Sequence, residues 1–214
     1  MLKRVEEYVE DLRKLALALT SAQMAKSVFV SEEGIGEDIA FNFFFWKENK
    51  VALIMQLNKE LMGLDHRQRF IVCADLCLAI RQYWGVDAIT MVAEGYCSQD
   101  PEKTKGLELA REFPKPDSKV MECITITHAE YGPKPEPNIQ LMACPYEYKQ
   151  GRIVEFHDPI YYSEGGGNIL RDKKYPAMLA KALQNEVLPS TDKLKDEILD
   201  EFHERGIFSQ DFGL

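Results

Sequence analysis

The chain has 214 residues, of which 45% are hydrophobic and 29% are charged. This balance is typical of a globular protein and excludes a disordered or fibrous chain. The 26 basic and 35 acidic side chains give a formal net charge of −9. That charge argues against a protein that coats duplex nucleic acid, because such binding requires a clustered basic surface. No 18 uncharged apolar residues follow one another and the beginning of the chain is acidic, so we expect neither a membrane span nor a secretory signal, and a cytoplasmic protein.

The cysteines are odd in number and each lies in an apolar run, without CxxC spacing. Such thiols are expected to be reduced and buried. Cys73 and Cys77 share one face of a predicted helix, where they are two candidate metal ligands, although packing in the core is the favoured interpretation. The five cysteines are Cys73, Cys77, Cys97, Cys123 and Cys144.

The first part of the chain predicts a helix followed by strands. Apolar residues at helical spacing predict a helix over residues 3–20, and a short apolar stretch predicts a strand over 27–30. The segments 39–46 and 51–57 are rich in aromatic and β-branched residues and are separated by four polar residues. This pattern predicts a β-hairpin.

A second helix is predicted over residues 66–84. Asp65 is placed to cap its first turn, and Gly85 follows where a left-handed residue usually ends a helix. The nearly continuous apolar run over 86–97 predicts a strand covered on both faces. The order of strand, helix and strand predicts a right-handed crossover if the two strands are parallel in one sheet.

The remainder predicts connections, three more strands and two more helices. Residues 98–118 are polar and contain three prolines, which indicates a long connection that is either functional or disordered. The Gly-rich segment 163–168 lacks the spacing of a phosphate loop and is interpreted as a flexible loop. Strands are expected over 120–129, 139–148 and 152–156, and helices over 174–186 and 191–205.

These elements predict an α+β fold with a single mixed, mostly antiparallel sheet. Helices pack on this sheet, and a C-terminal helical extension completes the chain. We expect a core domain over residues 1–162 and an extension over 163–214 that holds the Gly-rich loop and the acidic helices. Residues 186–214 contain eight acidic and three basic side chains. More than half of the net charge therefore lies there, as a solvated helical tail and a candidate binding site for a basic partner.

The histidines show none of the usual local metal motifs. If the last three strands run up and down in sequence order, His128 and His157 lie at the same edge of the sheet, roughly 10 Å apart. That distance is too large for a shared metal ion. We therefore expect both to be solvated residues at strand ends.

Glu94 and Glu122 are the candidate catalytic residues, because each interrupts an apolar strand. A carboxylate in such a place is exposed, paired or neutralised. If the two strands are antiparallel neighbours, the glutamates approach each other near the 98–118 connection, as a metal-assisted hydrolase or a general acid and base would require. Ion pairs at a sheet edge are the structural alternative. His128 is six residues from Glu122, roughly 20 Å along the strand, so a Glu/Glu/His triad is not expected.

Residues 57–126 resemble a group of small uncharacterised bacterial and phage-encoded proteins. In that group a buried helix precedes a strand that ends in a glutamate, a small residue and an aromatic one, and a basic residue precedes a glutamate on the next strand. The counterparts are Glu94-Gly95-Tyr96 and Lys119-Val120-Met121-Glu122. The resemblance implies a phage or bacterial source, with the host cytoplasm as the location if the protein is phage-encoded. It implies no activity.

Two functions are therefore expected. The first is a non-catalytic protein-interaction or accessory factor that binds a protein partner or forms a homodimer. Part of the aromatic run Phe43-Phe44-Phe45-Trp46 is a candidate for that surface, with burial on both sheet faces as the favoured account. The alternative is a small metal-assisted hydrolase or phosphoryl-handling enzyme that uses Glu94 and Glu122. No cofactor is expected, and the identity of any metal is left open.

Overall fold

The structure is a computed structural model that describes residues 42–48, 50–98, 120–131, 137–149, 152–157, 160–162 and 174–213. The predicted helix over 3–20, the predicted strand over 27–30, most of the 98–118 connection and the Gly-rich segment 163–168 lie outside these residues. The described elements are β1 (Asn42–Lys47), β2 (Lys50–Leu57), α2 (Lys59–Met62), α3 (His66–Trp84), β3 (Ala88–Ser98), β4 (Val120–Glu130), β5 (Asn138–Lys149), β6 (Arg152–Phe156), β7 (Ile160–Tyr162), α5 (Lys174–Leu183), α6 (Asp192–Glu204) and β8 (Ile207–Asp211).

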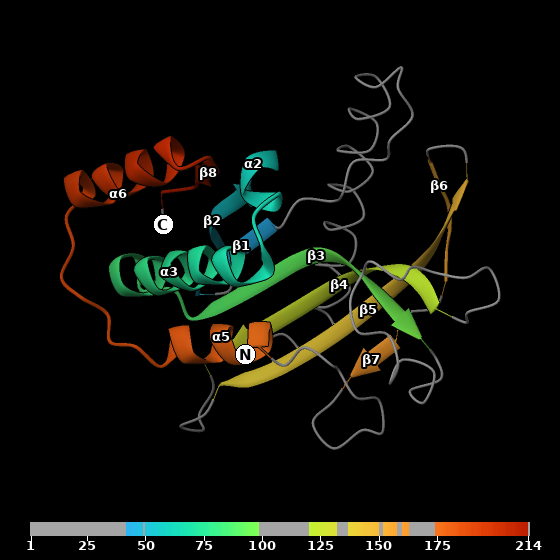
Figure 1. The fold of residues 1–214 in the computed structure, drawn as a ribbon. Coiled ribbons are helices and arrows are strands. Elements are labelled where there is room, and N and C mark those ends of the chain that lie inside the picture. Colours follow the sequence, from blue (N-terminus) through green and yellow to red (C-terminus); the bar gives the residue numbers. More distant parts are fainter. Residues whose placement is uncertain are drawn as a thin grey trace.

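The strands form one sheet in the order β6-β5-β4-β3-β1-β2-β8, and β7 pairs with β5 (Figure 1). Every described pair is antiparallel. Helices pack on this sheet, so the predicted α+β fold is confirmed. The strands predicted over 39–46, 51–57, 86–97, 120–129, 139–148 and 152–156 are all present as β1 to β6, and β6 has the predicted bounds.

β1 lies between β2 and β3 and is antiparallel to both. The strands β2 and β3 are therefore parallel to each other although they do not touch. The helix α3 connects them and crosses over β1. The predicted strand, helix and strand arrangement is thus present, with one strand inserted between the two that the helix joins.

The predicted ends of α3 are confirmed. Asp65 accepts a hydrogen bond from the backbone N–H of Gln68 at 2.9 Å, which satisfies one of the free donors of the first turn. Gly85 has φ 66° and ψ 33°, in the left-handed region, and its N–H donates to the carbonyl oxygen of Arg81. A Cβ at Gly85 would lie 3.3 Å from a methyl group of Val187.

Replacing Gly85 by alanine is expected to lower the free energy of unfolding by about 1–2 kcal/mol, because a side chain disfavours the left-handed conformation. The Gly85→Asn variant is the matched control: it adds the same Cβ beside Val187, but asparagine tolerates this conformation better. Urea unfolding of both variants measures the difference. Equal losses in both would assign the cost to the Val187 contact and not to the backbone.

One hydrophobic core lies between the sheet and the helices α3, α5 and α6, which cover the same face (Figure 1). The C-terminal elements contribute to it directly: Leu179 and Leu183 of α5, Phe202 of α6 and Ile207 of β8 are buried in the same cluster as the side chains of β1, β2 and α3. The helices predicted over 174–186 and 191–205 are confirmed as α5 and α6. The predicted boundary after residue 162 stays a prediction.

The opposite face of the central strands is buried as well. Phe44 and Trp46 project to that face, while Phe43 and Phe45 belong to the helix-side core, and all four side chains are buried. The expectation that the aromatic run packs on both sheet faces is confirmed. As a result, these side chains are not available as a surface for a partner.

Candidate functional site

The candidate residues Glu94 and Glu122 lie on neighbouring antiparallel strands, as their proposed role requires. Glu94 of β3 is opposite Ile124 of β4, and Glu122 is opposite Tyr96. The two glutamates thus occupy diagonal positions of one ladder, and such positions are roughly 7–8 Å apart. Whether the two carboxylates converge falls outside the described side chains and stays a prediction.

The histidine geometry predicted from the strand order is wrong. His128 of β4 is opposite Gln140 of β5, whereas the N–H of His157, just after β6, donates to the carbonyl oxygen of Pro145, five residues further along β5. The reason is the length of β5, whose far end continues past its pairing with β4 and carries β6. Five residues of strand correspond to roughly 17 Å, so the two histidines lie far apart along the sheet.

His128 is also not a solvated residue at a strand end. Its side chain is 6% exposed, and its Nδ1 shares a hydrogen bond of 2.8 Å with Oγ1 of Thr90. The same oxygen accepts a hydrogen bond of 2.9 Å from Nε1 of Trp46. These contacts link β1, β3 and β4 on the face of the sheet opposite the helices. Thr90 and Trp46 are distant from His128 along the chain, so the residues that surround His128 in the sequence do not reveal these partners.

Burial lowers the pKa of His128 to about 4. Desolvation disfavours the charged imidazolium, and the hydrogen bond to Thr90 is available to the neutral ring. His128 is therefore neutral at physiological pH. Its low exposure and neutral state fit a structural role in the sheet better than proton transfer to a substrate.

The cysteine pair on α3 packs in the core. Cys73 and Cys77 are buried and free of disulfides. Burial raises the pKa of the Cys73 thiol to about 12 and raises that of Cys77 well above its usual range. Metal binding requires the thiolate, so this environment disfavours a metal ion. Among the described residues, no three side chains of the ligand-forming types gather into a metal site.

The helix α6 carries a cluster of exposed acidic residues. The apolar side of this helix faces the core through Phe202, with Ile198 and Leu199 packed against the cluster. The opposite side carries the acidic residues, which span about half of the helix circumference at 100° per residue. We call this surface the α6 acidic face; its members, all exposed, are Asp192, Asp196, Glu197, Asp200, Glu201 and Glu204.

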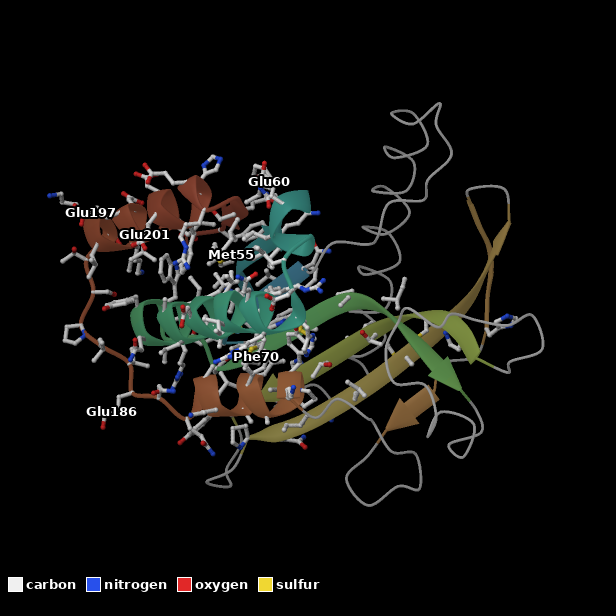
Figure 2. All side chains as sticks on the ribbon, viewed as in Figure 1. Met55, Glu60, Phe70, Glu186, Glu197 and Glu201 are labelled. Atoms are coloured by element: carbon white, nitrogen blue, oxygen red, sulfur yellow. The ribbon has the colours of Figure 1, made fainter. Side chains whose placement is uncertain are left out.

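Only part of this negative charge is compensated within the described residues. Nζ of Lys193 lies 3.4 Å from a carboxylate oxygen of Glu197, and Arg205 lies 3.7 Å from Glu201. Figure 2 shows Glu197 and Glu201 on α6. Nζ of Lys195 instead lies over the ring of Trp84, 5.8 Å from its centre. The other four acidic side chains have no cation partner in the described part of the chain.

The acidic helix is continued by β8, a strand that the sequence did not predict. A short turn through Gly206, with φ 82°, joins α6 to β8. β8 pairs with β2 and ends the strand order of the sheet on that side. The α6 acidic face is therefore next to a sheet edge, and the two features together form the strongest candidate for a functional surface in the described structure.

Comparison with protein-family models, with curated proteins and with solved structures gives no match to this chain. Of the helices that the structure describes, none combines the length and the apolar composition needed to cross a membrane. The functional argument consequently depends on the chemistry of the surfaces described above.

Proposed function

We propose that this protein is a non-catalytic interaction factor that binds a basic protein partner at the α6 acidic face. The observation that supports this proposal is the set of four exposed acidic side chains on one side of α6 for which the described residues provide no cation partner. The other side of this helix is fixed in the core. A rigid surface of one charge attracts partners of the opposite charge and accelerates their association. The proposed setting is the cytoplasm of a bacterium, or of a phage host.

The triple variant Asp196→Asn, Asp200→Asn and Glu204→Gln tests the role of this surface. We expect it to weaken binding of a lysine-rich peptide about tenfold, because three carboxylates that attract the ligand are lost. Fluorescence anisotropy of the labelled peptide measures the dissociation constant. Raising the salt concentration from about 50 to about 500 mM is expected to weaken binding as well, since these charges are exposed to solvent.

A matched control removes the same charge from another part of the surface. The variant Glu48→Gln, Glu60→Gln and Asp75→Asn changes the net charge by the same amount at exposed positions outside α6. We expect its affinity for the peptide to remain within about twofold of the unsubstituted protein. Equal weakening in the two triple variants would contradict the proposal, because the peptide would then respond to net charge alone.

A second candidate function is a small metal-assisted hydrolase or phosphoryl-handling enzyme that uses Glu94 and Glu122. The register supports it by making these two positions diagonal neighbours on adjacent strands, since a shared reacting atom must lie near both carboxylates. Hydrolysis of phosphate mono- and diesters with Mg²⁺ or Mn²⁺ is the assay. Activity that is lost in both Glu94→Gln and Glu122→Gln would favour this candidate over the interaction factor.

A further inference from the structure

The strand β8 has one edge paired and one edge open in the described structure. It pairs with β2 from Ile207 opposite Leu57 to Asp211 opposite Leu53. The N–H of Asn58 donates to the carbonyl oxygen of Gly206, and the N–H of Phe212 donates to that of Ala52. No described strand lies on the other side of β8.

The pairing shows which backbone groups are turned outward. In an antiparallel ladder, alternate residues direct both their N–H and C=O groups at the same neighbour. Because Gly206 and Phe212 bond toward β2, the even-numbered residues between them do so too. Ile207, Ser209 and Asp211 therefore present their N–H and C=O groups at the open edge. An unpaired row of this kind is a template for another strand.

The two faces of this edge differ in chemistry. Phe208 and Phe212 alternate to the face opposite the helices and are 53% and 46% exposed. The ring of His203 lies edge-on to the ring of Phe208, with 5.7 Å between the ring centres. On the other face, Asp211 accepts a hydrogen bond from Nε1 of Trp84. That face also adjoins α6 with its acidic residues.

We propose that the open edge of β8 takes up an extended segment of the protein partner as an additional strand, with alternating apolar and basic side chains. Side chains of an added strand alternate between the two faces. The apolar ones would meet Phe208 and Phe212, and the lysine or arginine side chains would lie toward Asp211 and the α6 acidic face. Main-chain hydrogen bonds to β8 would supply affinity. The alternation of apolar and basic side chains would supply specificity for the partner segment. This inference rests on the proposed function and specifies the partner segment.

A second copy of this chain fits the edge less well. Pairing of two β8 strands would bring Asp211 and the α6 acidic face of one copy close to those of the other. Like charges placed together at an interface oppose association. The charge of this surface therefore selects a basic segment over self-association.

The variant Ser209→Pro tests strand addition, with Ser209→Ala as its matched control. Proline removes the outward N–H of Ser209 without removing a hydrogen bond to β2, and proline is tolerated on edge strands. The probe is a short labelled peptide of alternating lysine and valine. We expect Ser209→Pro to weaken its binding about tenfold, while Ser209→Ala retains the affinity within about twofold.

A second measurement keeps the test decisive if Ser209→Pro unfolds. In the unsubstituted protein, the peptide is expected to slow hydrogen exchange of the Ser209 and Asp211 amides, which NMR resolves individually. Unchanged exchange at both amides, or full affinity in a folded Ser209→Pro variant, would overturn strand addition. The proposed function would then still stand if the α6 triple variant weakens binding. If neither Ser209→Pro nor the α6 triple variant weakens binding of the peptide, both proposals are overturned.

Discussion

Replacing Leu179 by alanine is expected to lower the free energy of unfolding by about 2–5 kcal/mol, the usual cost of truncating a large buried aliphatic side chain. Leu179 is 0% exposed and belongs to the core cluster that α5 shares with α3 and the sheet. α5 packs against α3 and β4, and Figure 2 shows Phe70 of α3 between α3 and α5. The cavity left by the truncation would therefore lie between these elements.

This variant also tests whether residues 174–213 unfold together with the rest of the protein. If they do, Leu179→Ala shifts one cooperative denaturant transition, followed by circular dichroism and by tryptophan fluorescence. Lys181→Ala is the control on the same helix; its side chain is exposed, and we expect a change within about 0.5 kcal/mol. A separate early transition that alone responds to Leu179→Ala would indicate an independent C-terminal unit.

The second large effect is the loss of stability in mild acid caused by His128. Burial lowers its pKa from 6.5 to about 4 in the folded protein, so between these values the unfolded chain binds the proton and the folded chain does not. Stability due to this group is therefore fully present above about pH 6.5 and falls as the pH is lowered to about 4. The lowering of the pKa from 6.5 to about 4 corresponds to a loss of about 3 kcal/mol of unfolding free energy across this pH range.

The variant His128→Asn isolates this contribution. Asparagine keeps a polar group for Thr90 but does not titrate, so we expect a weaker dependence of the unfolding free energy on pH between about 4 and 6.5. The pKa of Glu130 is raised by burial and by the nearby Asp87, which acts in the opposite direction. An unchanged pH dependence in His128→Asn would show that another group causes the acid sensitivity.

The sequence predicted the elements whose local signals agree with their environment. The β1–β2 hairpin combines aromatic and β-branched residues with a polar turn, and α3 has a capping aspartate and a terminal glycine. Each of these signals acts within a few residues. The strands β4, β5 and β6 were also predicted.

The features that were missed depend on pairing between distant residues. β8 has the sequence IFSQD and only its first residue is buried, so no alternating pattern marks it as a strand; its partner β2 specifies it. The relative positions of His128 and His157 depend on how far β5 extends beyond β4, which strand order does not reveal. For Glu94 and Glu122, the sequence predicted neighbouring strands, and the register adds their diagonal placement.

The pairing of β2 with β8 has a consequence for synthesis of the protein. About 150 residues separate Leu57 from its partner Ile207, and the chain is made from its N-terminus. The outer edge of β2 stays without its native partner until residues 207–211 have emerged, and the apolar surface that α5 and α6 cover stays open until those helices have been made. An exposed strand edge beside uncovered apolar surface favours aggregation. Nascent chains stalled before residue 174 should therefore depend most on chaperones that shield such surfaces.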